Sequence, residues 1–106
     1  AVTLPSCEAG IKIKIIFGAV TSNTHSITAA ATDELLSGYA LMLDTADGTA
    51  AKHIVFAPDE SDDDAFSMNG TTTGVSAEVE LLGRSDKKWQ IEARVYASGA
   101  VATPFA

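Results

Sequence analysis

The sequence is poor in several residue types, and each shortage excludes a class of protein. Its one cysteine, Cys7, cannot form a disulfide within the chain, which excludes a disulfide-framed secreted miniprotein. Only 7 Lys and Arg stand against 14 Asp and Glu, a formal charge of −7, whereas a nucleic-acid binder needs a basic face. No stretch approaches the ~18–20 uninterrupted apolar residues of a membrane-spanning helix. We therefore expect no nucleic-acid partner and no membrane partner.

The start of the chain also lacks the features of a secretory signal, since no basic region is followed by an apolar stretch. A first residue of Ala suits removal of an initiator Met and equally a trimmed mature chain. We favour the first, and with it synthesis in the host cytoplasm. The 106 residues have the length of one domain, and such a chain buries roughly 60–70% of its unfolded surface. We predict a single β domain over residues 1–106, with extended N- and C-terminal tails.

Apolar residues recur with a period of two in several short segments, which is typical of half-buried strands. Turn-forming residues separate these segments every ~10–15 residues. Residues 29–38 are ambiguous, because their alanines favour a helix and Gly38 can end one. Phe66 and Met68 re-enter the core after a charged loop. The segments predicted as strands are residues 11–17, 25–28, 39–43, 52–56, 75–81 and 89–95.

This spacing predicts an all-β fold: a small antiparallel β-sandwich or barrel, jelly-roll-like, of about six or seven strands, with at most one short helical turn. The last two segments form a hairpin with one apolar and one charged face. Glu78 and Glu80 are expected near Lys88 and Arg94 across this hairpin. Trp89 is the expected anchor of the core.

Catalytic residues are hard to place in this sequence. Cys7 and one of the two histidines, His25 or His53, would be needed for a Cys–His dyad in a small hydrolase. No local signature accompanies these residues, so we interpret them as a buried thiol and two ordinary imidazoles. We expect no enzyme and no catalytic residue.

The acidic run at residues 59–64 invites a calcium hypothesis, because Asp59, Ser61 and Asp63 match the first three oxygen positions of a helix–loop–helix calcium site. The match then fails, since Asp64 stands where the glycine bend belongs and Gly70 where the bidentate Glu belongs. A loose cation site remains an alternative to a solvated loop, which we favour. We expect no metal and no cofactor.

Exposed aromatic rings are the usual platform for a sugar, and Trp89, Tyr39 and Tyr96 are the candidates here. Core packing is the commoner role of such rings, and the chain has one Trp. The three rings are therefore candidates both for a sugar-binding platform and for the core.

The order of short motifs along the chain resembles the small β-rich virion proteins of tailed bacteriophages, in particular capsid decoration (cement) proteins. The chain departs from the pattern at residues 87–88, where two lysines stand in place of the glycine or asparagine often found before the Trp, and in its long acidic run. The motifs that carry the resemblance, spaced over most of the chain, are Val2-Thr3-Leu4-Pro5 and Gly10, Ile27-Thr28, Asp33-Glu34-Leu35-Leu36-Ser37-Gly38, Gly74-Val75, Glu78-Val79-Glu80-Leu81 and Trp89-Gln90-Ile91.

The resemblance implies a viral structural protein located in the virion, on the outer capsid surface. Proteins of this kind commonly form homotrimers that bind the major capsid protein and stabilise the shell by bridging capsomers. The apolar ends, with Pro5 and Pro104, are expected to become ordered by strand addition to a neighbouring subunit or to the shell. The acidic run at residues 59–64 is expected to face solvent, away from the docking side. Interface candidates are Val2, Leu4, Pro5, Val101, Pro104 and Phe105.

An alternative function is a phage tail or surface module that recognises host glycan. Replacement of Trp89 distinguishes glycan recognition from capsid decoration. A ring that serves as a sugar platform can be removed without unfolding the domain, whereas removal of a core ring lowers the free energy of unfolding by roughly 3–5 kcal/mol.

Overall fold

The computed structural model describes residues 2–18, 25–44, 52–69, 73–97 and 102–106. These residues form eight strands, and none of them forms a helix, so the all-β prediction is confirmed. It follows that no helix in the described part is long and apolar enough to cross a membrane. The strands are β1 (Val2–Thr3), β2 (Lys12–Phe17), β3 (His25–Thr28), β4 (Leu36–Asp44), β5 (Lys52–Phe56), β6 (Ala65–Met68), β7 (Ser76–Gly83) and β8 (Trp89–Ala97).

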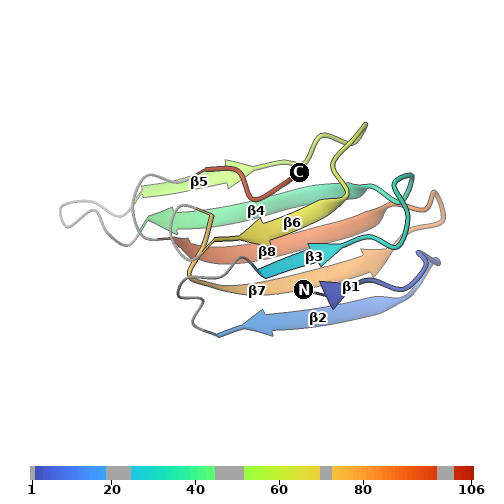
Figure 1. Ribbon diagram of the computed structural model, residues 1–106, viewed down its shortest axis with the longest axis horizontal. Helices are drawn as coiled ribbons and strands as arrows, with labels where there is room; N and C mark the ends of the chain where they lie inside the picture. The colour runs from blue at the N-terminus through green and yellow to red at the C-terminus, as the bar shows by residue number, and fades with distance from the viewer. Residues whose placement is uncertain (1, 19–24, 45–51, 70–72, 98–101) are drawn as a thin grey trace.

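The strands lie in two sheets that form two layers (Figure 1). One sheet has three strands in the order β1-β3-β6, and the other has five in the order β2-β7-β8-β4-β5. Neither sheet closes into a barrel, and the strands number eight, so the predictions of a barrel and of six or seven strands are wrong. The wholly antiparallel arrangement is also wrong, because β1 pairs with β3 and β4 pairs with β8 in parallel. The reason is that the β7–β8 hairpin inserts between β2 and β4, which local alternation does not specify.

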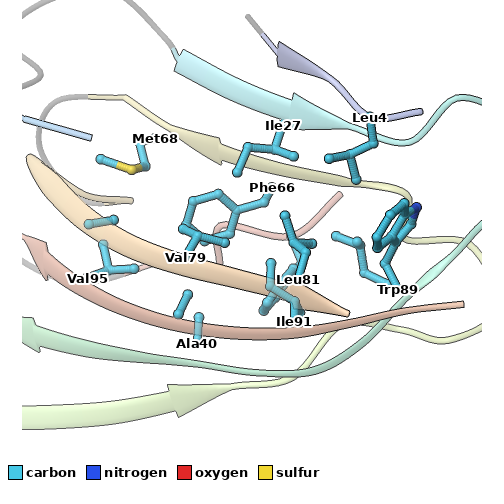
Figure 2. Close-up of a cluster of buried hydrophobic side chains, with 14 of the residues drawn as sticks. Leu4, Ile27, Ala40, Phe66, Met68, Val79, Leu81, Trp89, Ile91 and Val95 are labelled. Atoms are coloured by element: carbon cyan, nitrogen blue, oxygen red, sulfur yellow. The ribbon is translucent and has the colours of Figure 1, made fainter. Parts of the chain in front are cut away.

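The hydrophobic core lies between the two layers, as Figure 2 shows. Alternation along β7 and β8 turns every second side chain inward, so Val79, Leu81, Ile91 and Val95 have no more than 1% of their surface exposed. Ile27, Phe66 and Met68 reach down from the three-stranded sheet, and Trp89 closes the end of the core near Leu4 (Figure 2). Trp89 itself has no exposed surface.

The ambiguous segment, residues 29–38, forms bends and a turn and then enters β4 at Leu36. The helical turn allowed for this segment is therefore absent, and Gly38 is a strand residue with φ +113°. A Cβ on Gly38 would collide with the backbone carbonyl of Ile91 on β8. Glycine is needed here because the two backbones approach closely and because φ lies in the region that other residues avoid.

Both ends of the chain pair with its own three-stranded sheet. Beside β1, the Leu4 N–H donates to the Thr28 carbonyl at 2.8 Å. At the other end, the Ser67 N–H donates to the Pro104 carbonyl at 2.8 Å, and Ala65 and Ala106 exchange two hydrogen bonds at 2.9 and 3.0 Å. The last residues therefore run along β6 as an added strand, which supplies within one chain the pairing expected from a neighbour.

The six interface candidates are accordingly divided. Leu4 is 2% and Phe105 6% exposed, and the ring of Phe105 packs edge-on against Phe66 at 5.9 Å. Pro104 is also buried, whereas Val2 and Pro5 are exposed and Val101 lies outside the described residues. Three of the six therefore belong to the core of this chain, because burying their apolar surface against β3 and β6 stabilises the short sheet.

Candidate functional site

The side of the five-stranded sheet that faces away from the core is the largest surface without a covering element in the described part of the chain. The three-stranded sheet covers only one side of the five-stranded sheet (Figure 1). We call the other side the open face. Since side chains alternate along a strand, its members are the residues between the core positions. They are Lys12, Lys14, Ile16, Tyr39, Leu41, Leu43, His53, Val55, Ser76, Glu78, Glu80, Leu82, Gln90, Glu92, Arg94 and Tyr96.

The register of the sheet arranges these side chains in rows across the strands. One row places Lys14, Glu80, Glu92 and Tyr39 on β2, β7, β8 and β4. The neighbouring row places Ile16, Glu78, Arg94, Leu41 and Val55 on the same four strands and β5. Charged groups thus occupy the middle of the face and, with Lys12 and Lys14, much of its β2 edge, whereas Leu41 and Val55 lie toward the β5 edge.

The charges of the open face balance. Three cations, Lys12, Lys14 and Arg94, stand against three carboxylates on β7 and β8. The Arg94 guanidinium lies 2.8 Å from a Glu78 oxygen, which confirms the cross-strand pair expected for this hairpin. This hydrogen bond raises the pKa of Arg94. Lys88 instead pairs with Glu60 at 3.1 Å, because the hairpin register places Lys88 opposite Arg84, four or more residues from Glu80 and Glu78.

One row contains a like-charge contact, since Glu80 and Glu92 are direct cross-strand partners. Lys14 approaches Glu80 at 3.8 Å, with both side chains about half exposed. An exposed pair of this kind contributes ~0–1 kcal/mol, and two carboxylates opposite each other oppose folding by a similar amount. The charged stripe therefore adds little stability.

Apolar side chains are unusually exposed on the same face. Five of the seven large apolar side chains exposed in the described residues lie there: Ile16 at 66%, Val55 at 61%, Tyr96 at 46%, Leu82 at 44% and Tyr39 at 42%. Single exposed apolar residues are common, but several on one uncovered face are typical of an interaction surface. The face therefore combines several exposed apolar side chains with balanced charge.

Shallow grooves cross the open face, one of about 210 Å³ beside Leu82 and Gln90 and two larger ones. One, of about 310 Å³, runs beside Tyr39 and Leu41 and is bordered by Glu80, Glu92 and Arg94. The other, of about 250 Å³, lies at the opposite end beside Ile16 and Tyr96. Both of these grooves have the width for side chains or sugar rings, and their linings include the hydroxyl groups of Tyr39, Ser76 and Tyr96.

The Cys–His dyad is not assembled. The thiol of Cys7 lies 3.4 Å from the Lys88 carbonyl, beside the end of the sheet where Trp89 and Leu36 pair. Burial raises the pKa of Cys7, and the charges of Glu34 and Asp86 add to the rise. His53 lies about 23 Å along β4 from that end, given seven residues at ~3.3 Å each.

His25, the other histidine, packs edge-on against Phe17 with 6.3 Å between the ring centroids. It is a partly buried residue of β3 and has no contact with the thiol among the described interactions.

The acidic loop uses its oxygens to hold its own turn. Asp59 accepts hydrogen bonds from the Ser61 N–H at 2.9 Å and the Ser61 hydroxyl at 2.6 Å, and these bonds lower the pKa of Asp59. Asp63 accepts from the Asp59 N–H at 2.7 Å. The negative charge of Asp59 raises the pKa of Asp62. In the described residues no three His, Cys, Asp or Glu side chains converge as metal ligands do.

The three aromatic candidates fall into two groups. Trp89 is inside the core, so it offers no platform, whereas Tyr39 and Tyr96 are exposed on the open face. The indole N–H of Trp89 and one oxygen of Glu34 are buried without a hydrogen-bond partner. The sequence identified the two tyrosines as candidate exposed rings but did not predict the open face as a whole. The available signal was the apolar residues at outward positions, Ile16 after two lysines and Leu82 after two glutamates.

Comparison of the chain with protein-family models, with curated proteins and with solved structures gave no match.

Proposed function

We propose that this chain is a capsid decoration protein, which binds the outer surface of a tailed-phage head and stabilises the shell by bridging capsomers. Its partners are the major capsid protein and further copies of itself in a homotrimer, and its location is the virion. The observation that carries the proposal is the open face, a broad uncovered sheet surface on a small all-β domain. The sequence resemblance to decoration proteins supplies the identity of the partner.

The electrostatics of the molecule support docking by the open face. The acidic loop lies at one end of the five-stranded sheet, where Glu60 interacts with Lys88 and Ser37. The net negative charge is therefore concentrated at one end of a face whose own charges balance. This arrangement lets the face approach a protein shell without a long-range penalty, while the loop keeps the exposed side solvated.

The test is binding of purified protein to phage heads that lack it, measured by co-sedimentation. The double variant Ile16→Ser and Tyr96→Ser removes two apolar anchors at exposures of 66% and 46%, so folding is retained and binding is expected to fall at least tenfold or so. The matched control is Ile54→Ser, 43% exposed on the opposite side of the same sheet, which is expected to bind as wild type. Equal binding by the double variant and the wild-type protein would refute docking by the open face.

The wider proposal is tested by mass spectrometry of purified virions. A copy number close to that of the major capsid protein is the expected result. A few copies per particle would favour a tail role, and absence from particles would overturn both phage assignments.

A second candidate, glycan recognition, rests on the groove beside Tyr39. An exposed ring next to Glu80, Glu92 and Arg94 offers stacking together with hydrogen-bond acceptors and donors. Tyr39→Ala is expected to abolish glycan binding at unchanged stability, as read by a glycan array and a thermal melt. An array that is blank for the wild-type protein removes this candidate.

A further inference from the structure

The free edge of β5 differs from the other edges of the two sheets. β2 carries Lys12 and Lys14, which discourage edge pairing, and β1 is only two residues long. The edge of β6 is covered by residues 104–106. β5 ends the five-stranded sheet on its other side, at the upper margin in Figure 1, and the described residues place no strand beyond it.

The hydrogen-bonding pattern shows which β5 residues point outward. The Leu35 carbonyl accepts from the Trp89 N–H at 2.9 Å, so the odd-numbered residues of this segment turn their backbone groups toward β8. The even-numbered residues, Ala40 and Met42, then bond to their β5 partners Phe56 and Ile54. His53 and Val55 consequently direct their N–H and C=O groups away from β4, to the free edge.

The side chains of β5 are apolar and exposed on both faces of the sheet. Val55 is 61% exposed on the open face, and Ile54 is 43% exposed on the opposite side, where the three-stranded layer ends. A strand with unpaired backbone groups and exposed β-branched residues on both faces is a ready template for another strand. Unlike β2, this strand has no lysine at an outward position, because Lys52 turns its backbone groups toward β4.

The charges that flank β5 indicate what adds to it. The strand begins with the basic pair Lys52-His53, and residues 59–64, shortly after its end, contain five acidic residues. An antiparallel strand of the same sequence, with His53 opposite Val55, would place its Lys52 opposite Phe56. Its basic start would then lie ~10 Å from Asp59, the first acidic residue of the flank, and symmetry would repeat this approach. A parallel copy would place like charges together. A two-fold axis is also the commonest symmetry of soluble homo-oligomers.

We propose that β5 is a self-association edge, at which β5 of a second copy pairs antiparallel and joins the two five-stranded sheets into one. The pairing uses the outward groups of His53 and Val55 and buries Ile54 and Val55 of both copies. It is independent of the capsid assignment, because it requires only this chain.

The experiment is sedimentation velocity of the purified chain over a series of concentrations. Without phage heads, the wild-type protein is expected to show a monomer–dimer equilibrium, because the proposed homotrimer is expected to assemble on the shell. Val55→Pro removes an outward N–H and is tolerated on an edge strand, so it is expected to weaken association about tenfold or more.

The matched control is Ile16→Pro on β2. Gly83 N–H donates to the Ile11 carbonyl at 2.7 Å, so the even-numbered residues of β2 point outward, and Ile16 is a β-branched residue 66% exposed on the other edge of the same sheet. This control is expected to dimerise as wild type. If Val55→Pro proves unfolded by circular dichroism, Val55→Lys, which brings like charges together at the axis, is compared with Ile16→Lys instead.

A wild-type chain that is monomeric at every concentration, or that forms a trimer without a dimer, overturns the proposal. So does equal association of the Val55 and Ile16 variants. Co-sedimentation of the Val55 variant with phage heads is a separate readout, so loss of self-association and loss of capsid binding are distinguished.

Discussion

Replacement of Trp89 tests the packing of the core most directly. Trp89 has no exposed surface, and truncation of a buried Trp to Ala costs roughly 3–5 kcal/mol, about a fifth or more of the ~5–15 kcal/mol that stabilises an ordinary domain. The indole N–H, however, is buried without a partner, which itself costs about 1–3 kcal/mol. The two terms predict different outcomes for two substitutions.

Trp89→Phe keeps most of the ring and removes the unpaired N–H. Its loss of buried area costs roughly 1–2 kcal/mol, and the recovered desolvation offsets this, so the free energy of unfolding is expected within about 1 kcal/mol of wild type. Trp89→Ala is expected to lose about 3 kcal/mol or more. The control is Leu82→Ala, 44% exposed on the open face, with an expected loss below about 1 kcal/mol.

The assay is urea unfolding followed by far-ultraviolet circular dichroism, because Trp89 is the only tryptophan and its removal abolishes the fluorescence signal. The slope with urea should stay constant across the variants. If Trp89→Ala unfolds at the wild-type midpoint, the ring is not in the core. If Trp89→Phe costs as much as Trp89→Ala, the indole N–H has a partner and the reasoning about its desolvation is refuted.

Two further substitutions and one labelling measurement test other parts of the structure. Phe105→Ala removes a ring 6% exposed against Phe66 and is expected to cost about 3 kcal/mol in urea unfolding; a cost below about 1 kcal/mol would mean that the C-terminal residues do not pack there. Gly38→Ala drives a Cβ into the Ile91 carbonyl at a φ of +113°, so a drop in melting temperature of several degrees is expected, and an unchanged melt would contradict the close approach of β4 and β8. The Cys7 thiol is buried with a raised pKa, so Ellman's reagent should label the native protein at pH 8 at least about tenfold more slowly than the urea-unfolded chain; equal rates would place the thiol at the surface.

Most strands were predictable because their signal is local. Alternation located β2, β7 and β8, and the apolar run followed by turn residues located β4 and β5. β1 was missed because two residues carry no periodicity, and the alanines of residues 29–31 suggested a helix that tertiary contacts override. Two of the turn-forming segments that separate the predicted strands, residues 21–24 and 44–48, lie almost wholly outside the described residues.

The candidate site was less predictable, because it depends on which strands are neighbours. Lys14, Glu80, Glu92 and Tyr39 come from four separate strands, and only the register β2-β7-β8-β4 places them in one row. The ends were misread for the same reason: apolar tails with prolines suggest a missing partner, and here the partner of residues 104–106 is β6 of the same chain.

By itself, the sequence determined the all-β class, the inward set of β7 and β8, the buried place of Trp89 and the concentration of the acidic excess in one loop. These follow from period-two alternation and from charge repulsion, which act between residues close in the chain. Only the tertiary structure decided that β4 pairs in parallel with β8, that Phe105 is buried in the core, and which residues form the open face. Each of these depends on contacts between distant segments, and the free energy of those contacts is set by what the whole fold buries.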